Sequence, residues 1–134
     1  MNLLDASAVI ASIMEEGDLT IVNKILKEPC AISAVNYSEV VLKLQKIMRL
    51  KNGSDGATPL NLIHHALYGM HLDIVAFGKN EAHALLTNPK LTGAQLSLAD
   101  RICLATAITH NHTIVTADKM WATLELPLQI TLIR

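Results

Sequence analysis

Apolar positions along the chain follow two different periods, and the changes between them divide the sequence into alternating helices and strands. The clearest example is the stretch 96–118. Ser97 is a good helix N-cap, and the apolar residues after it recur at helical spacing as far as Asn111, which can end the helix. Residues 113–115 are β-branched and typical of a short buried strand. This stretch therefore predicts a helix followed by a strand.

The same patterns recur along the whole chain. Strands are predicted over residues 1–5, 30–34, 72–77, 113–115 and 128–133. Helices are predicted over 6–16, over 19–27 behind Asp18, after Asn36, from Thr58-Pro59 to about 68, over 80–86, between Ser97 and Asn111, and as a short turn at 120–121, with a loop over 52–56. Strands that alternate with helices predict an α/β fold, a three-layer α/β/α sandwich with a mostly parallel sheet of about five strands. The sequence has no repeat or low-complexity segment, so we expect a single domain, 1–134.

Composition indicates the kind of core and the cellular compartment, but says little about the chemistry of a site. Hydrophobic residues make up 51% of the chain and aromatic ones 3%, which predicts an aliphatic core that also takes Trp121. The net charge of -1 does not draw the protein to nucleic acid, so such contact needs a local basic patch. Cys30 and Cys103 stand among apolar residues and are interpreted as buried thiols in a reducing compartment. Without a run of about 20 apolar residues or the basic start of a signal peptide, we expect no membrane span and a cytoplasmic protein.

Four carboxylates stand at equivalent places in the predicted fold. Asp5 and Asp118 each follow a strand, whereas Glu39 and Asp100 each lie in the first turn of a predicted helix. Because the carboxyl ends of parallel strands meet at one edge of a sheet, we expect the four to gather there.

Two interpretations of these acids compete. Residues 36–39 and 97–100 resemble capping boxes, and Asp5 and Asp118 can each cap the helix that follows. Four gathered anions, however, repel one another and raise one another's pKa, a cost that a divalent cation removes. Oxygen ligands without His or Cys favour Mg²⁺ or Mn²⁺, and such a site suits hydrolysis of a phosphodiester.

Four blocks of sequence carry a family resemblance. They are Asp-Ala-Ser at 5–7, Ser-Ala-Val-Asn-Tyr-Ser-Glu-Val at 33–40, Leu-Ser-Leu-Ala-Asp at 96–100 and Val-Thr-Ala-Asp at 115–118. In this order, across nearly the whole chain, they resemble the signature blocks of PIN domains, and most of all those of VapC-like toxins from bacterial toxin–antitoxin pairs.

The resemblance implies a fold, an activity and partners. It implies that Asp5, Glu39, Asp100 and Asp118 coordinate Mg²⁺ or Mn²⁺ in an endoribonuclease, which a small antitoxin neutralises and which forms a homodimer. Ser7 and Thr116 match small hydroxyl positions beside the acids. Each either orients a ligand or the metal's water, or only caps a turn.

The chain holds one basic cluster, which has two interpretations. It is either a solvated helix face or a guide for an RNA backbone, since phosphate contacts supply most sequence-independent affinity. Its members are Lys43, Lys46, Arg49 and Lys51. Lys43, Lys46 and Arg101 are the candidates for RNA contacts because they are near Glu39 and Asp100 in sequence.

Two other functions remain open. The first is a phosphotransfer module phosphorylated on Asp5, but it requires a second acid two residues later, where Ser7 stands. The second is a non-catalytic PIN-like binding module, which would not need all four acids. The six histidines are assigned no part in the site, and the RNA target is not specified by the sequence.

Overall fold

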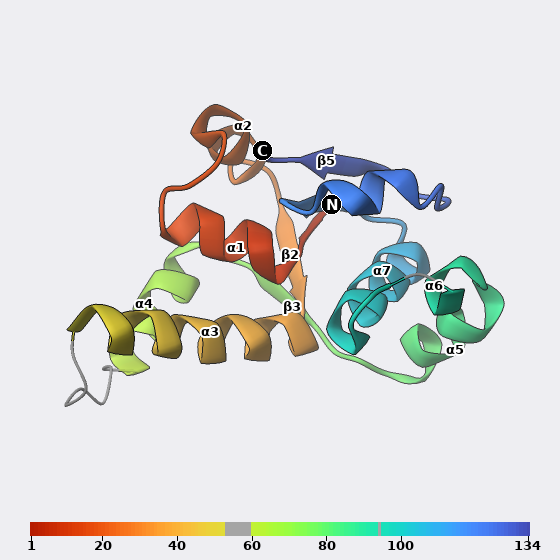
Figure 1. Ribbon diagram of the computed structural model, residues 1–134, viewed down its shortest axis with the longest axis horizontal. Helices are drawn as coiled ribbons and strands as arrows, with labels where there is room; N and C mark the ends of the chain where they lie inside the picture. The colour runs from red at the N-terminus through yellow and green to blue at the C-terminus, as the bar shows by residue number, and fades with distance from the viewer. Residues whose placement is uncertain (53–59, 94) are drawn as a thin grey trace.

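The computed structural model describes residues 1–52, 60–93 and 95–134, and these form a sheet with helices on both faces (Figure 1). The strands are β1 Asn2–Leu4, β2 Cys30–Ser33, β3 Asp73–Val75, β4 Thr113–Thr116 and β5 Ile130–Leu132. The helices are α1 Ala6–Ile13, α2 Leu19–Ile25, α3 Ala34–Asn52, α4 Leu60–Gly69, α5 Lys79–Thr87, α6 Lys90–Gly93, α7 Leu98–His110 and the 3₁₀ helix η1 Lys119–Thr123. No helix in these described ranges is long and apolar enough to cross a membrane.

The sheet confirms the predicted α/β class. Its five strands run in the order β3-β2-β1-β4-β5, and every neighbouring pair is parallel. In β1, Asn2 lies opposite Cys30 of β2 on one side and Thr113 of β4 on the other. The first strand of the chain is therefore the central strand of the sheet, and the order of the strands reverses between β1 and β4.

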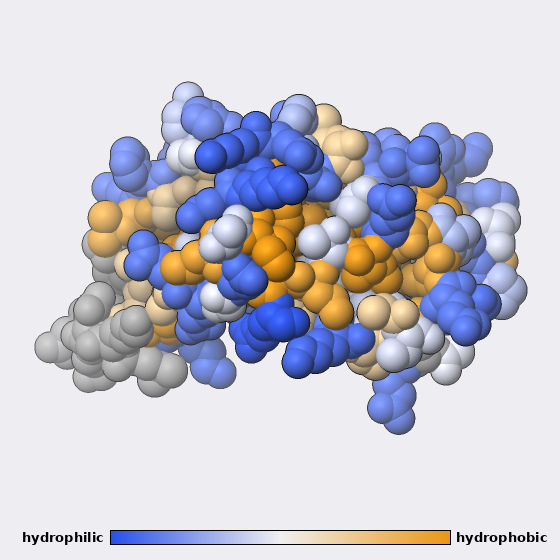
Figure 2. Space-filling model, turned by 90° about the horizontal axis from the view of Figure 1, so that it is seen from above, coloured by the Kyte–Doolittle hydropathy of each residue, from blue (hydrophilic) through white to orange (hydrophobic). Residues whose placement is uncertain are grey.

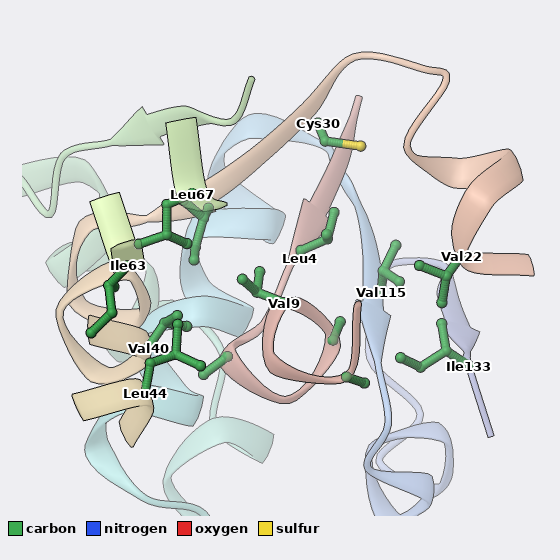
Figure 3. Packing of buried hydrophobic residues seen from close by; sticks show 14 residues of the cluster. Leu4, Val9, Val22, Cys30, Val40, Leu44, Ile63, Leu67, Val115 and Ile133 are labelled. Carbon is green, nitrogen blue, oxygen red and sulfur yellow. The ribbon is translucent and has the colours of Figure 1, made fainter. Parts of the chain in front are cut away.

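Successive residues of the central strand serve two separate cores. Leu4 packs with buried residues of α1, α2, α3 and α4 on one face, as Figure 3 shows for Val9, Val22 and Val40. Leu3 packs on the other face with α5, α6, α7 and η1, where Trp121 is buried as predicted. Both cores are mainly aliphatic, and together with the sheet they make the predicted three-layer sandwich.

The best-predicted helix boundaries are those of α7. The Ser97 hydroxyl accepts the N–H of Asp100 at 3.1 Å, and the Asp100 carboxylate accepts the N–H of Ser97 at 3.2 Å. Asn111 ends the helix with φ of +53°, in the left-handed region that asparagine tolerates. Asp18 likewise caps α2, as its sequence predicts.

The predicted start of α3 at Asn36 is wrong. The helix begins at Ala34, because the Ser33 hydroxyl at the end of β2 accepts the N–H of Asn36 at 3.0 Å and so takes the capping place. The buried Asn36 side chain accepts the Ser33 hydroxyl instead. Glu39 consequently lies in the second turn of α3 and belongs to no capping box.

Other boundaries differ by a few residues. Helix α1 ends at Ile13 and not at 16, since Glu15 takes a φ of +55°. Between the helices predicted over 80–86 and after Ser97, the chain forms a further short helix, α6, for which no helix is predicted. Asn52 ends α3, while the rest of the predicted loop over 52–56 and the predicted helix start at Thr58-Pro59 lie outside the described residues.

Large hydrophobic side chains also lie on the surface. Figure 2 shows hydrophobic side chains across the middle of one face, bordered by hydrophilic ones. The helices α3 and α4 expose Leu42, Leu60, Leu62 and Tyr68, each by more than half of its area. An apolar groove of about 240 Å³, which shares Leu62 with these exposed residues, lies between α1, α3 and α4 and is lined by Ile13, Met14, Leu44, Ile47, Met48, Leu62, Ile63 and Ala66.

Candidate active site

Asp5 lies at the point where the strand order reverses. It directly follows β1, and its N–H donates to the Val115 carbonyl of β4 at 3.0 Å. Only 5% of the residue is exposed. In open parallel sheets, the carboxyl ends of the strands at such a reversal form the crevice where ligands bind. The topology therefore places this carboxylate at the position on the sheet where a ligand-binding site is most expected.

The Asp5 carboxylate accepts hydrogen bonds from three residues. The N–H of Ala8 donates at 2.8 Å, so Asp5 also caps α1. The Ser7 hydroxyl donates at 2.7 Å to Oδ1, and the Thr116 hydroxyl donates at 2.8 Å to Oδ2. Burial raises the pKa of Asp5 above its usual 3.8, these hydrogen bonds lower it, and the charge of Asp100 raises it, with a net rise.

Ser7 and Thr116 join the ends of β1 and β4. The Ser7 hydroxyl oxygen accepts the N–H of Ala117, and the Thr116 hydroxyl oxygen accepts the N–H of Asp118, both at 3.0 Å. The two hydroxyl oxygens are 3.4 Å apart. The structure thus places both predicted hydroxyl residues against Asp5, where they fix the orientation of its carboxylate.

Asp100 and Glu39 share a buried neighbour with Asp5. Cys103 lies one turn after Asp100 on α7 and is fully buried. Burial is the main cause that raises the pKa of its thiol, and the charges of Asp5, Asp100 and Glu39 add to the rise. The thiol therefore stays neutral, and it senses the charges of three of the four predicted acids.

Asp118 is less closely linked to the other acids. It is half-buried and caps η1, since its carboxylate accepts the N–H of Met120 at 3.0 Å. Its link to Asp5 runs through the Thr116 hydroxyl, which donates to Asp5 and accepts the N–H of Asp118. The capping role expected for Asp118 is present, and its role as a metal ligand stays a prediction.

The donor set fits a hard cation in its chemistry but does not converge on one point. Among the described residues, no group of three or more His, Cys, Asp or Glu side chains could hold a metal ion as placed. Asp100 is engaged in its capping box, and Glu39 accepts a hydrogen bond from Lys43 at 3.4 Å. Carboxylate oxygens are nonetheless the ligands that Mg²⁺ and Mn²⁺ prefer. Metal binding would therefore require these acidic side chains to move closer together.

The candidate RNA contacts have different surroundings. Lys43 and Lys46 line a groove beside Ser7, together with Arg134, which no pattern in the sequence places there. Arg101 is half-buried, and its Nε donates to the Leu91 carbonyl at 2.9 Å, which connects α7 to α6. Arg49 is exposed, and the side chain of Lys51 lies outside the described residues.

One histidine has a clear structural partner. The His110 ring bonds to Oε1 of Glu81 at 2.7 Å, and this hydrogen bond is the main cause that lowers the pKa of Glu81. Glu81 is buried and also accepts the N–H of Gly78 at 3.0 Å. The pair joins α5 to the last turn of α7, away from the four predicted acids in sequence.

Comparison with known proteins gives a family and a fold. Residues 3–125 match the family described as PIN domain. No curated protein matches the sequence. Among solved structures, a chain of VapBC2 from Rickettsia felis, bound to a promoter DNA fragment, aligns at 18% identity and a TM-score of 0.70, covering 97% of this chain and 96% of that one.

Two further structures agree. A toxin–antitoxin complex from Klebsiella pneumoniae aligns at 20% identity and a TM-score of 0.70, covering 100% of this chain and 98% of that one. DNA-bound VapBC from Salmonella typhimurium aligns at 13% identity and a TM-score of 0.73, covering 99% and 98%. At these identities, the likeness shows that the chain has the same fold.

Proposed function

The chain belongs to the PIN domain family, and we propose that it is a metal-dependent endoribonuclease, the toxin of a toxin–antitoxin pair. One observation carries the proposal. A carboxylate, Asp5, is buried where the strand order reverses, and the charge of Asp100 raises its pKa further.

The electrostatics of this carboxylate favour a cation ligand over a purely structural role. As a helix cap alone, Asp5 could be replaced by serine or asparagine, which cap equally well without a charge to bury. Burying a carboxylate near another anion costs free energy that a bound cation offsets. The raised pKa of Asp5 is the sign of that cost.

Each residue then has a proposed role. Asp5, Asp100 and Glu39 are the proposed ligands of Mg²⁺ or Mn²⁺, and Asp118 completes the set directly or through water. The ion, when bound, would polarise the phosphoryl oxygen and lower the pKa of the attacking water. Ser7 and Thr116 hold the Asp5 carboxylate in one orientation. Lys43 donates to Glu39 in the free protein and would face phosphate once Glu39 turns to a cation.

Two features of the surface support a protein partner. The exposed Leu60 and Leu62 of α4 and the apolar groove that Leu62 lines offer the kind of surface that protein partners cover. The solved structures with this fold include toxin–antitoxin complexes. We therefore expect a small antitoxin to bind this chain, and a homodimer and a cytoplasmic location remain predictions.

A cleavage assay with matched variants tests the nuclease. The wild type should cut RNA with Mg²⁺ or Mn²⁺ and stop with EDTA, and either ion should raise its melting temperature. Asp5→Asn and Asp100→Asn should fold but lose both cleavage and the metal-induced rise. Asp18→Asn, which alters an exposed cap on α2, is the control and should keep both. Full cleavage in excess chelator, or by both site variants, would contradict the proposal.

Expression in a bacterial host tests the toxin role. The wild type should arrest growth, Asp5→Asn should not, and co-expression of the cognate small partner should restore growth. If the wild type is harmless at high yield while it cuts RNA in the test tube, a role in RNA processing replaces that of a toxin.

A further inference from the structure

A groove with Ser7 in its lining lies between α1 and α3, next to the carboxylate site. Its volume is about 380 Å³. The Ser7 hydroxyl donates to Asp5, so the groove adjoins the site. The residues that line it are Ser7, Ile10, Ala11, Glu16, Lys43, Lys46, Ile47 and Arg134.

The groove concentrates positive charge in a chain whose net charge is -1. Three of its lining side chains, Lys43, Lys46 and Arg134, are cationic, against one carboxylate, Glu16. The side chains of Lys43 and Arg134 are 56% and 53% exposed, so their charges face solvent. This is the local basic patch that nucleic-acid binding requires in a protein without an overall positive charge.

Arg134 comes from a distant part of the sequence and forms an ion pair with Glu16. Its guanidinium lies 3.8 Å from the carboxylate of Glu16, which is itself 57% exposed. Exposed pairs at such distances are weak and are readily exchanged for another anion. A phosphate entering the groove would compete with Glu16 for this guanidinium.

Building on the proposed ribonuclease function, we propose that the groove holds the phosphates of single-stranded RNA next to the scissile bond. Lys46 and Arg134 contact these phosphates, and Glu16 restrains Arg134 and weakens RNA binding in the free protein. RNA is favoured over an acidic peptide because the groove lies next to Asp5, to which the Ser7 hydroxyl in its lining donates. A strand with its scissile phosphate there must continue along the neighbouring surface, and phosphates would follow at each nucleotide.

Salt-dependent binding of a labelled single-stranded RNA, followed by fluorescence anisotropy in EDTA, tests this inference. Lys46→Ala and Arg134→Ala should each reduce the slope of log affinity against log salt by about 0.7, the value for one phosphate contact on a single strand. Lys27→Ala, which removes an exposed lysine ahead of β2, at the opposite ends of the strands, should leave the slope unchanged. Glu16→Gln should tighten binding by roughly 1.5- to 5-fold, the equivalent of a surface ion pair. Glu15→Gln removes a neighbouring exposed charge outside the groove lining and is its control.

The outcomes separate this inference from the nuclease proposal. Wild-type slopes in Lys46→Ala and Arg134→Ala would overturn it, as would equal effects of Glu16→Gln and Glu15→Gln, even if RNA is cleaved. If the groove variants weaken RNA binding as expected but no cleavage occurs with Mg²⁺ or Mn²⁺, the groove stands and the nuclease proposal fails. If a short glutamate-rich peptide binds through Lys46 and Arg134 while RNA does not, the groove serves an acidic protein and the inference is overturned.

Discussion

Replacing Asp5 with asparagine or with alanine should affect folding very differently, although both changes remove the same charge. Asparagine keeps a carbonyl oxygen for the Ala8 N–H and the Ser7 hydroxyl, and its NH₂ can donate to the Thr116 oxygen. Alanine leaves all three of these donors without their acceptor. The structure therefore predicts a small effect for Asp5→Asn and a large loss of stability for Asp5→Ala.

The hydrogen bonds of Asp5 set the size of that loss. Losing an N-cap costs about 1 kcal/mol. Leaving a buried hydroxyl such as that of Thr116 without its acceptor costs about 1–3 kcal/mol more. Asp5→Ala should therefore lose about 2–4 kcal/mol, which for a domain of this size lowers the melting temperature by roughly 6–14 °C. The free energy of unfolding of Asp5→Asn should stay within about 1 kcal/mol of the wild-type value. At neutral pH this variant should be more stable than the wild type, because it buries no charge.

The sign of the pH dependence provides a second test. The folded-state pKa of Asp5 is raised above 3.8, so the folded protein binds this proton more tightly than the unfolded chain does. In chelator, the contribution of Asp5 to wild-type stability should therefore fall as the pH rises from 3.8 through the folded-state pKa and then level off. Asp5→Asn lacks this loss, so its advantage over the wild type should grow across that window.

Urea unfolding of the wild type, Asp5→Asn and Asp5→Ala, between about pH 4 and pH 7, measures both effects. The control is Asp18→Asn, which makes the same exchange at an exposed cap. If the difference in unfolding free energy between Asp5→Asn and the wild type does not change with pH, the buried charge of Asp5 does not destabilise the folded protein. The argument for a cation at this position would then fail.

Two further predictions concern the stability of the fold outside the candidate site. Glu81→Gln should lower the free energy of unfolding by about 1 kcal/mol at neutral pH, as expected for a partly exposed charged hydrogen bond to His110. The pKa of Glu81 lies below 4.5, so urea unfolding should show this contribution disappearing as the pH falls through that lowered pKa. A difference between wild type and Glu81→Gln that stays constant with pH would contradict the pairing. Gly17→Ala should cost about 1–3 kcal/mol, since Gly17 has φ of +78° and a Cβ there would lie 2.8 Å from the Ile133 carbonyl oxygen. Thermal melts should show a clear loss for Gly17→Ala and little change for the control Gly69→Ala, where an added Cβ meets nothing within 4 Å, and equal melts would refute the assigned strain.

The parts of the fold that the sequence predicted well depend on local signals. Ser97 and Asn111 bound α7 because a capping box and a left-handed asparagine act within a few residues. The predicted start of α3 at Asn36 is wrong because Ser33, an equally good cap, lies at the end of β2 and caps the same turn. A choice between two adjacent caps depends on where the strand ends, which the sheet pairing decides.

The candidate site shows the same division. Ser7 and Thr116 lie against Asp5, as the family resemblance implies, because parallel strands bring their carboxyl ends to one edge of the sheet. Cys103 and Arg134 carried no such signal. A buried thiol near three acids and an arginine facing Glu16 depend on contacts between elements that are distant in sequence. The metal-binding roles of the four acids remain predictions, because their side chains as placed do not converge on one metal position among the described residues.

The position of the first strand has a consequence for the order of events during synthesis. The hydrogen bond from Thr116 to Asp5 joins residues 111 positions apart. Contacts of such long sequence separation pay a large loop-closure entropy and form slowly. A nascent chain thus exposes Asp5 among its first residues but has no Thr116 or Asp118 to pair with until most of the chain has been made. The carboxylate site is assembled only when β4 docks beside β1, so an unfinished chain on the ribosome carries no complete site.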